Sequence, residues 1–162
     1  MKKALTWYIL SVLVLLGLTA CNPINDVKAD IANERHAKKL SKKIVEYIND
    51  DDVNGMKKLF SEYYQSNFEL EEEIKYFFDS IDGKILSYEF KYYGEDGSVR
   101  DGKWTKQSSI IRLENIKTDL GKEYNISISE YLKYEDDKSK EGIYDLEVRN
   151  ADRKRIASIY HD

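Results

Sequence analysis

The sequence is poor in the residues that build disulfides, zinc sites and histidine-based catalytic sites. It has one cysteine, one proline and two histidines in 162 residues. A single cysteine excludes a disulfide within the chain. His36 and His161 lie far apart in the sequence, so the clustered ligands of a zinc site are missing. No Gly-x-Ser-x-Gly elbow, phosphate loop or dinucleotide fingerprint occurs, and we expect no metal and no cofactor.

One long stretch lacks charge. It runs from Ala4 to Ala20 and directly follows Lys2 and Lys3. A basic start, an apolar run and small residues before a cleavage site are typical of a secretory signal. The stretch closes with Leu18-Thr19-Ala20-Cys21, which resembles the lipobox of bacterial lipoproteins. That resemblance implies cleavage before Cys21 and a diacylglycerol linked to its sulfur.

An uncleaved N-terminal anchor is the alternative, because the apolar stretch is near the shortest length that spans a membrane. Lipidation also explains the lone cysteine, and two or more acyl chains anchor a protein stably. We therefore predict a signal peptide over residues 1–20, a lipidated cysteine with a short tether over 21–25, and a single domain over 26–162. The protein would sit on the outer leaflet of the bacterial cytoplasmic membrane.

The charge of the expected mature protein limits its partners. Loss of Lys2 and Lys3, with no acidic residue, would change the formal net charge from −4 to −6. An acidic domain argues against nucleic acid as a partner, and against broad contact with anionic lipid headgroups. We expect attachment to the membrane through Cys21 alone, and an unknown protein partner or small ligand.

Apolar residues recur at three- and four-residue steps in the first half of the chain. This spacing predicts amphipathic helices over residues 27–48, 52–63 and 70–81. Asp26 is a suitable N-cap for the first helix, and Asp51 or Asp52 for the second.

From Leu86 the apolar period changes to two, which is typical of half-buried strands. The parity slips between Trp104 and Leu113, and this predicts a bulge near Ser108 and Ser109. Helices first and strands afterwards indicate an α+β domain, with three N-terminal helices packed on one face of a curved antiparallel meander sheet of about five strands. The turns between strands are expected at residues 95–98, 119–121, 136–142 and 150–153.

Several phrases of the sequence resemble a known family. They are DDVNGMKKLFS (51–61), FFDSIDGKI (77–85), RDG (100–102), NIKTD (115–119) and KEGI (140–143). Together they resemble an uncharacterised family of small lipoproteins from Gram-positive Firmicutes, over roughly residues 26–149. The order of elements resembles the cystatin-like and nuclear transport factor 2-like cone-shaped folds. The resemblance implies this fold, lipid anchoring and an extracytoplasmic location, and it brings no activity and no catalytic residues.

The leading functional hypothesis is a noncatalytic binding module. Lipidated domains with a concave sheet usually present that surface to a partner, which is an analogy between folds and not an argument from a site. Aromatic residues and arginine dominate the energetics of interfaces. For any single aromatic residue, such as Trp104, an ordinary place in the apolar core is the simpler explanation. The candidate binding face consists of Tyr92, Arg100, Trp104, Tyr131 and Tyr144.

Two further hypotheses stay open. An immunity or inhibitor lipoprotein would mask a toxin or hydrolase, and an acidic domain would suit a basic target. An enzyme would need a carboxylate base inside the concave sheet, for which Asp101 and Glu130 are the candidates. Either carboxylate would need a pKa raised by burial to act near neutral pH.

Overall fold

A computed structural model describes residues 23–161. The chain divides into two units between Asn33 and Glu34, so residues 23–33 are described separately. Those residues form the first turns of helix α2 (Pro23–Asn49). Cys21 and the apolar stretch before it lie outside the described residues, and the predicted signal peptide and lipidation site stay predictions. Among residues 23–161, no helix is both long and apolar enough to cross a membrane.

Within the described chain, four α-helices precede the sheet, one more than predicted. They are α2 (Pro23–Asn49), α3 (Val53–Lys57), α4 (Glu62–Asn67) and α5 (Leu70–Asp79). Helix α2 starts at Pro23, inside the predicted tether, so Asp26 is not its N-cap. Proline is tolerated in a first helical turn because its missing N–H would have no helical partner there.

The prediction of a single second helix is wrong, because the structure has two short helices, α3 and α4, in its place. The Ser61 N–H donates to the Ile143 carbonyl at 3.1 Å, and the Ile143 N–H donates to the Leu59 carbonyl at 3.1 Å. The backbone between α3 and α4 thus bonds to a strand instead of continuing the helix. Ser61 then caps α4, since its hydroxyl accepts a hydrogen bond from the Tyr64 N–H at 3.4 Å.

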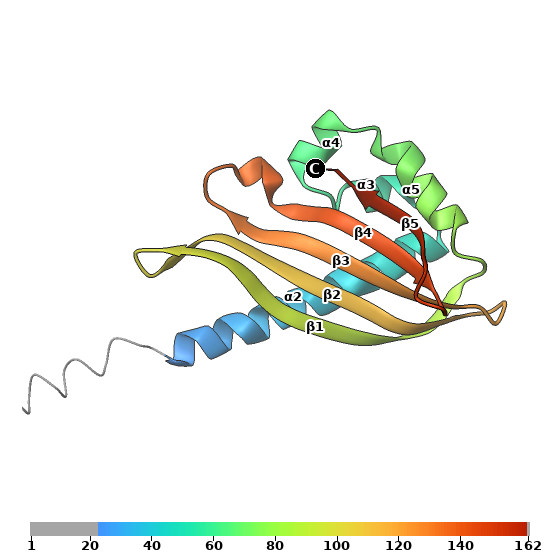
Figure 1. Ribbon diagram of the computed structural model, residues 1–162, viewed down its shortest axis with the longest axis horizontal. Coiled ribbons are helices and arrows are strands. Elements are labelled where there is room, and N and C mark those ends of the chain that lie inside the picture. The colour runs from blue at the N-terminus through green and yellow to red at the C-terminus, as the bar shows by residue number, and fades with distance from the viewer. Residues whose placement is uncertain (1–22, 162) are drawn as a thin grey trace, which may run out of the picture. The chain divides into compact units, whose positions relative to one another are not determined.

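The described residues form one antiparallel sheet of five strands, paired in the order of the sequence. Figure 1 shows the sheet in front of the C-terminal part of α2, with α3, α4 and α5 grouped beside β4 and β5. The α+β class and the meander are therefore confirmed. The strands are β1 (Ile85–Arg100), β2 (Lys103–Thr118), β3 (Glu123–Tyr134), β4 (Gly142–Asn150) and β5 (Arg155–Tyr160), with a 3-10 helix η1 (Lys138–Lys140) before β4.

The turn predicted at residues 95–98 is wrong, because β1 continues to Arg100. The chain reverses at Asp101 and Gly102, whose φ angles of 51° and 72° suit the Asp-Gly pair of a tight hairpin. A register shift between Tyr92 and Glu95 lets the polar stretch stay paired with β2. The bulge predicted near Ser108 is confirmed, since the pairing of β2 with β3 shifts between Gln107 and Ser108.

One face of the sheet is covered by helices, and apolar side chains fill the space between. From the helices, Ile44, Met56, Leu70, Ile74 and Phe77 are fully buried. They pack in one cluster with residues that alternate along the strands, since every second side chain of a strand points to the same face. The sheet residues of this core include Ile111, Leu113, Ile116, Ile126, Ile128, Leu146 and Val148.

Two neighbours on α5 test this division between core and surface. Phe77 is fully buried and Tyr76 is 64% exposed. Phe77→Ala should lower the free energy of unfolding by about 3–5 kcal/mol, because it leaves a cavity in the core. Tyr76→Ala is the matched control and should change it by less than about 0.5 kcal/mol. Urea unfolding of both variants measures the difference, and equal effects would contradict the described packing.

Candidate functional site

The other face of the sheet carries polar, charged and aromatic side chains, and we call it the outer face. Its residues lie in rows across the strands: Ile110 pairs with Ser129, and Ser129 pairs with Asp145. In the next row Arg112 pairs with Ser127, and Ser127 pairs with Glu147. A hollow of about 790 Å³ lies over these rows. We call it the outer hollow, and it is the candidate functional site.

Glu147 is neutralised by the protein itself. Arg149 donates to one of its oxygens, and the Arg155 Nε lies 2.5 Å from the other. Burial alone would raise the pKa of Glu147, but these two guanidinium groups hold its pKa below the usual range. Glu147 therefore stays ionised and has its counter-ions in place.

Asp145 lies two residues earlier on the same strand and has a different environment. The Ser129 hydroxyl lies 3.4 Å from its Oδ2, and no described lysine or arginine forms an ion pair with it. Burial raises the pKa of Asp145, and the charge of Glu147 raises it further. The Ser129 hydrogen bond and the charge of Arg155 oppose this rise without cancelling it. The outer hollow thus contains a half-buried carboxylate without a counter-ion.

Tyr131, Tyr134 and Tyr144 form a tyrosine cluster beside Asp145. The rings of Tyr131 and Tyr144 stack with centroids 4.2 Å apart, and Tyr134 meets Tyr131 edge-on at 5.1 Å. The Lys106 Nζ lies 4.8 Å from the centroid of Tyr131 and 5.2 Å from that of Tyr134. Burial raises the pKa of Tyr144, and the neighbouring Tyr131 and Asp145 add to the effect. The aromatic rings and the carboxylate are therefore parts of one surface.

The structure brings together part of the candidate binding face. Tyr131 and Tyr144 stack, as described, and Trp104 lies on β2 two residues before Lys106. Trp104 is 37% exposed, so a place in the core does not explain it. Tyr92, by contrast, pairs with the buried Ile111 and so lies on the helix-covered face. Tyr144 also packs in part against the core, although its ring stacks on Tyr131. Arg100 is exposed beside Lys103 at the tip of the first hairpin.

Asp145, Ser129 and Lys106 were not anticipated from the sequence. Their importance comes from pairing across strands, which depends on register. The one local signal is Asp145 itself, an acidic residue between Tyr144 and Leu146 in a predicted strand.

A comparison with protein families gives one match. The model of a domain of unknown function, DUF5104, matches residues 43–155. The chain belongs to the DUF5104 family. The matched segment contains strands β1 to β4 and the residues of the outer hollow just described, whereas Cys21 and most of α2 lie outside it. A search of curated proteins finds no match.

The two candidate bases of the DUF5104 domain lie in different places. Asp101 is exposed in the tight turn of the first hairpin. Glu130 is 3% exposed and lies on the helix-covered face. It accepts a hydrogen bond from the Ser109 hydroxyl at 3.0 Å, and the His36 Nε2 of α2 lies 3.0 Å from its other oxygen. Neither carboxylate faces the outer hollow, and both oxygens of Glu130 are occupied by internal donors.

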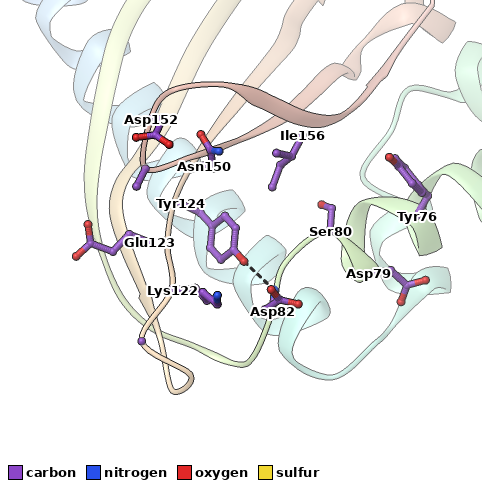
Figure 2. Close-up of a pocket in the computed structure, with 12 residues that line it drawn as sticks. Tyr76, Asp79, Ser80, Asp82, Lys122, Glu123, Tyr124, Asn150, Asp152 and Ile156 are labelled. Atoms are coloured by element: carbon purple, nitrogen blue, oxygen red, sulfur yellow. Dashed lines mark hydrogen bonds between the residues drawn. The ribbon is translucent and has the colours of Figure 1, made fainter.

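A second hollow, of about 750 Å³, lies where three connections meet. These are the α5–β1 connection, the β2–β3 turn and the β4–β5 turn, as Figure 2 shows. The Tyr124 hydroxyl accepts a hydrogen bond from the Asp82 N–H at 3.0 Å, which ties the first connection to β3. Asp79, Asp82, Glu123 and Asp152 make the lining acidic. Among residues 23–161, no cluster of three or more His, Cys, Asp or Glu is arranged to hold a metal ion.

The contact between His36 and Glu130 predicts a pH-dependent stability. The hydrogen bond to Glu130 raises the pKa of His36, while burial and the charges of Lys39 and Lys43 oppose the rise. The stabilisation is complete below the pKa of His36 in the unfolded chain, and it is lost as pH rises through the raised folded pKa. It should stay below about 1 kcal/mol, because the His36 side chain is 53% exposed and solvent screens the pair.

Urea unfolding of the wild-type chain and of His36→Asn, over pH 5 to 8, tests this. The difference between the two proteins isolates His36, because every other residue is the same in both. The wild-type chain should have the higher free energy of unfolding at low pH, and its difference from His36→Asn should shrink as pH rises. A pH-independent difference, or one that grows with pH, would contradict the described pair. Glu130→Gln should abolish the same pH dependence.

Proposed function

We propose that this DUF5104 protein is a noncatalytic binding module that is held at the outer leaflet of the bacterial cytoplasmic membrane by a lipidated Cys21. It binds its partner with the outer face of the sheet. The observation that carries this proposal is the contrast between the two faces of the sheet. The helix-covered face is filled by a buried apolar core, whereas the outer face bears an open hollow lined by charged and polar side chains, with the tyrosine cluster beside it.

The composition of the outer face supports a binding role. Aromatic residues and arginine are the side chains that most often dominate binding energy. Tyr131, Tyr144 and Arg112 are on this face, and the last of these stacks its guanidinium 4.7 Å from the ring centroid of Tyr93. A hollow of about 790 Å³ is also within the usual size range of ligand sites, roughly 300–1,000 Å³. The proposal covers a protein partner and a small ligand.

The evidence for the membrane anchor comes from the sequence. The basic start, the uncharged stretch and the single cysteine after small residues are all explained by a lipoprotein signal. No other cysteine is present to pair with Cys21. An acidic domain gains little from anionic lipids, so a covalent lipid would have to provide the attachment.

Replacement of Cys21 tests the anchor. In cells fed a fatty-acid analogue that carries a chemical tag, the wild-type chain should acquire the tag and Cys21→Ser should not, because serine cannot form the thioether. If Cys21→Ser stays fully in the membrane fraction and the wild-type chain carries no tag, an uncleaved N-terminal anchor replaces the lipidation proposal.

A photo-crosslinking amino acid tests the binding face. It should replace Ser127, in the outer hollow, and in a matched control Lys75, an exposed residue of α5. On illumination of cells, position 127 should give a discrete cross-linked species that position 75 does not give. With the crosslinker kept at position 127, Ile110→Arg should remove that species, because Ile110 is an exposed residue of the hollow and the bulky charge blocks it. Equal cross-linking from both faces, or none from position 127, would contradict the proposed binding face.

A further inference from the structure

On the outer face, Asp145 is a half-buried carboxylate to which the described residues give no ion pair. Glu147 lies between Arg149 and Arg155, whereas the described residues give Asp145 a hydrogen bond from Ser129 and no ion pair. Partial burial removes some of the water that stabilises a charged carboxylate. An external cation placed against Asp145 would restore this stabilisation, and a charge pair that is partly shielded from water is stronger than one that is fully hydrated.

The tyrosines beside Asp145 already hold ammonium groups. Lys106 lies over Tyr131 and Tyr134, and the Lys140 Nζ lies 5.3 Å from the centroid of Tyr134 and 5.1 Å from that of Tyr63. The negative face of an aromatic ring attracts such cations. This end of the outer face is therefore built from groups that accept organic ammonium ions.

The cross-strand row that contains Asp145 also includes apolar and aromatic side chains on either side of the carboxylate. Ile110 pairs with Ser129 on one side, and Tyr160 pairs with Asp145 on the other. They are 41% and 53% exposed. Exposed apolar and aromatic area on both sides of a carboxylate fits the flat surface of a protein better than a small amine, which would cover the carboxylate alone.

We propose that Asp145 and the tyrosine cluster receive a lysine side chain of a protein partner. This inference rests on the proposed function and gives its partner a chemical character. The ammonium group pairs with the Asp145 carboxylate beside Tyr144, and the methylene stem lies along the tyrosine rings. The net negative charge of the chain favours the approach of a basic surface.

Several charged or titratable groups face Asp145, and they set the pH dependence. Glu147 and Tyr144 on β4 and Arg155 on β5 lie nearby, and the Ser129 hydroxyl of β3 donates a hydrogen bond to Asp145. Burial raises the pKa of Tyr64 on α4, and the charge of Asp145 adds to that rise. Binding needs the ionised carboxylate. Affinity should therefore fall as pH drops through the raised pKa of Asp145.

A titration with a pentalysine peptide tests the inference. The full chain, purified in detergent, is followed by NMR at the backbone amides of Ser129, Tyr144 and Asp145. Asp145→Asn should weaken binding about tenfold, because the isosteric amide keeps the shape and removes the charge. Asp145→Glu should retain part of the affinity. Asp51→Asn is the control and should leave affinity within about twofold. Asp51 is exposed in a loop with a φ of 53°, a conformation that asparagine tolerates.

The outcomes separate this inference from the proposed function. Equal weakening by Asp145→Asn and Asp51→Asn would mean unspecific attraction, and it would overturn the inference. Shifts of the same amides by choline but not by pentalysine would replace a protein lysine by a small ammonium ligand. If the cross-link from position 127 persists unchanged in Asp145→Asn, the lysine site is wrong and the binding face stands. If the wild-type chain gives no such cross-link, the proposed function itself fails.

Discussion

The structure depends on burial of one face of the sheet against the helices. Phe77 and Ile74 of α5 and Ile44 of α2 are fully buried in the same cluster as the alternating residues of β2, β3 and β4. Because side chains of a strand alternate, this burial also fixes which residues point the other way. A shift of one residue in register would move Asp145 and Ser129 into the core and expose Leu146 and Ile128. The apolar core therefore determines the composition of the outer face.

The outer face combines a compensated and an uncompensated acid on one strand. Glu147 has two guanidinium partners, while the pKa of Asp145 is raised by burial and by Glu147. A half-buried charge without a partner destabilises the folded chain unless it is neutralised, so such a group is unfavourable for stability alone. A cation from a partner would neutralise the Asp145 carboxylate beside the stacked tyrosines and remove this unfavourable contribution. The same reasoning explains why Glu130, with two internal donors, serves to join α2 to β3.

Much of the fold follows from the sequence, because period and order of elements are local properties. The change of period at Leu86 correctly marks where helices end and strands begin. The division of the second helix could not be read from spacing, since Ser61 and Leu59 bond to Ile143, more than eighty residues away. The first hairpin was misplaced for a related reason. Two sites with Gly-containing turn signals compete there, and pairing with β2 selects Asp101-Gly102.

The site was less predictable than the fold. Residue type alone pointed to Tyr131 and Tyr144, but it also pointed to Tyr92, which faces the core. Only the register of β3 and β4 shows that Asp145 lies beside the tyrosines and away from any basic side chain that would pair with it in the described chain.

The most direct test of this account is the pKa of Asp145, measured in the full chain by carbon NMR of its carboxyl group. We expect a value above the ordinary one for aspartate, and a fall in that value when a lysine peptide occupies the outer hollow. An ordinary or lowered value in the free chain would mean that Asp145 already has a counter-ion or is fully hydrated. The outer face would then lack the uncompensated charge on which the proposed recognition depends.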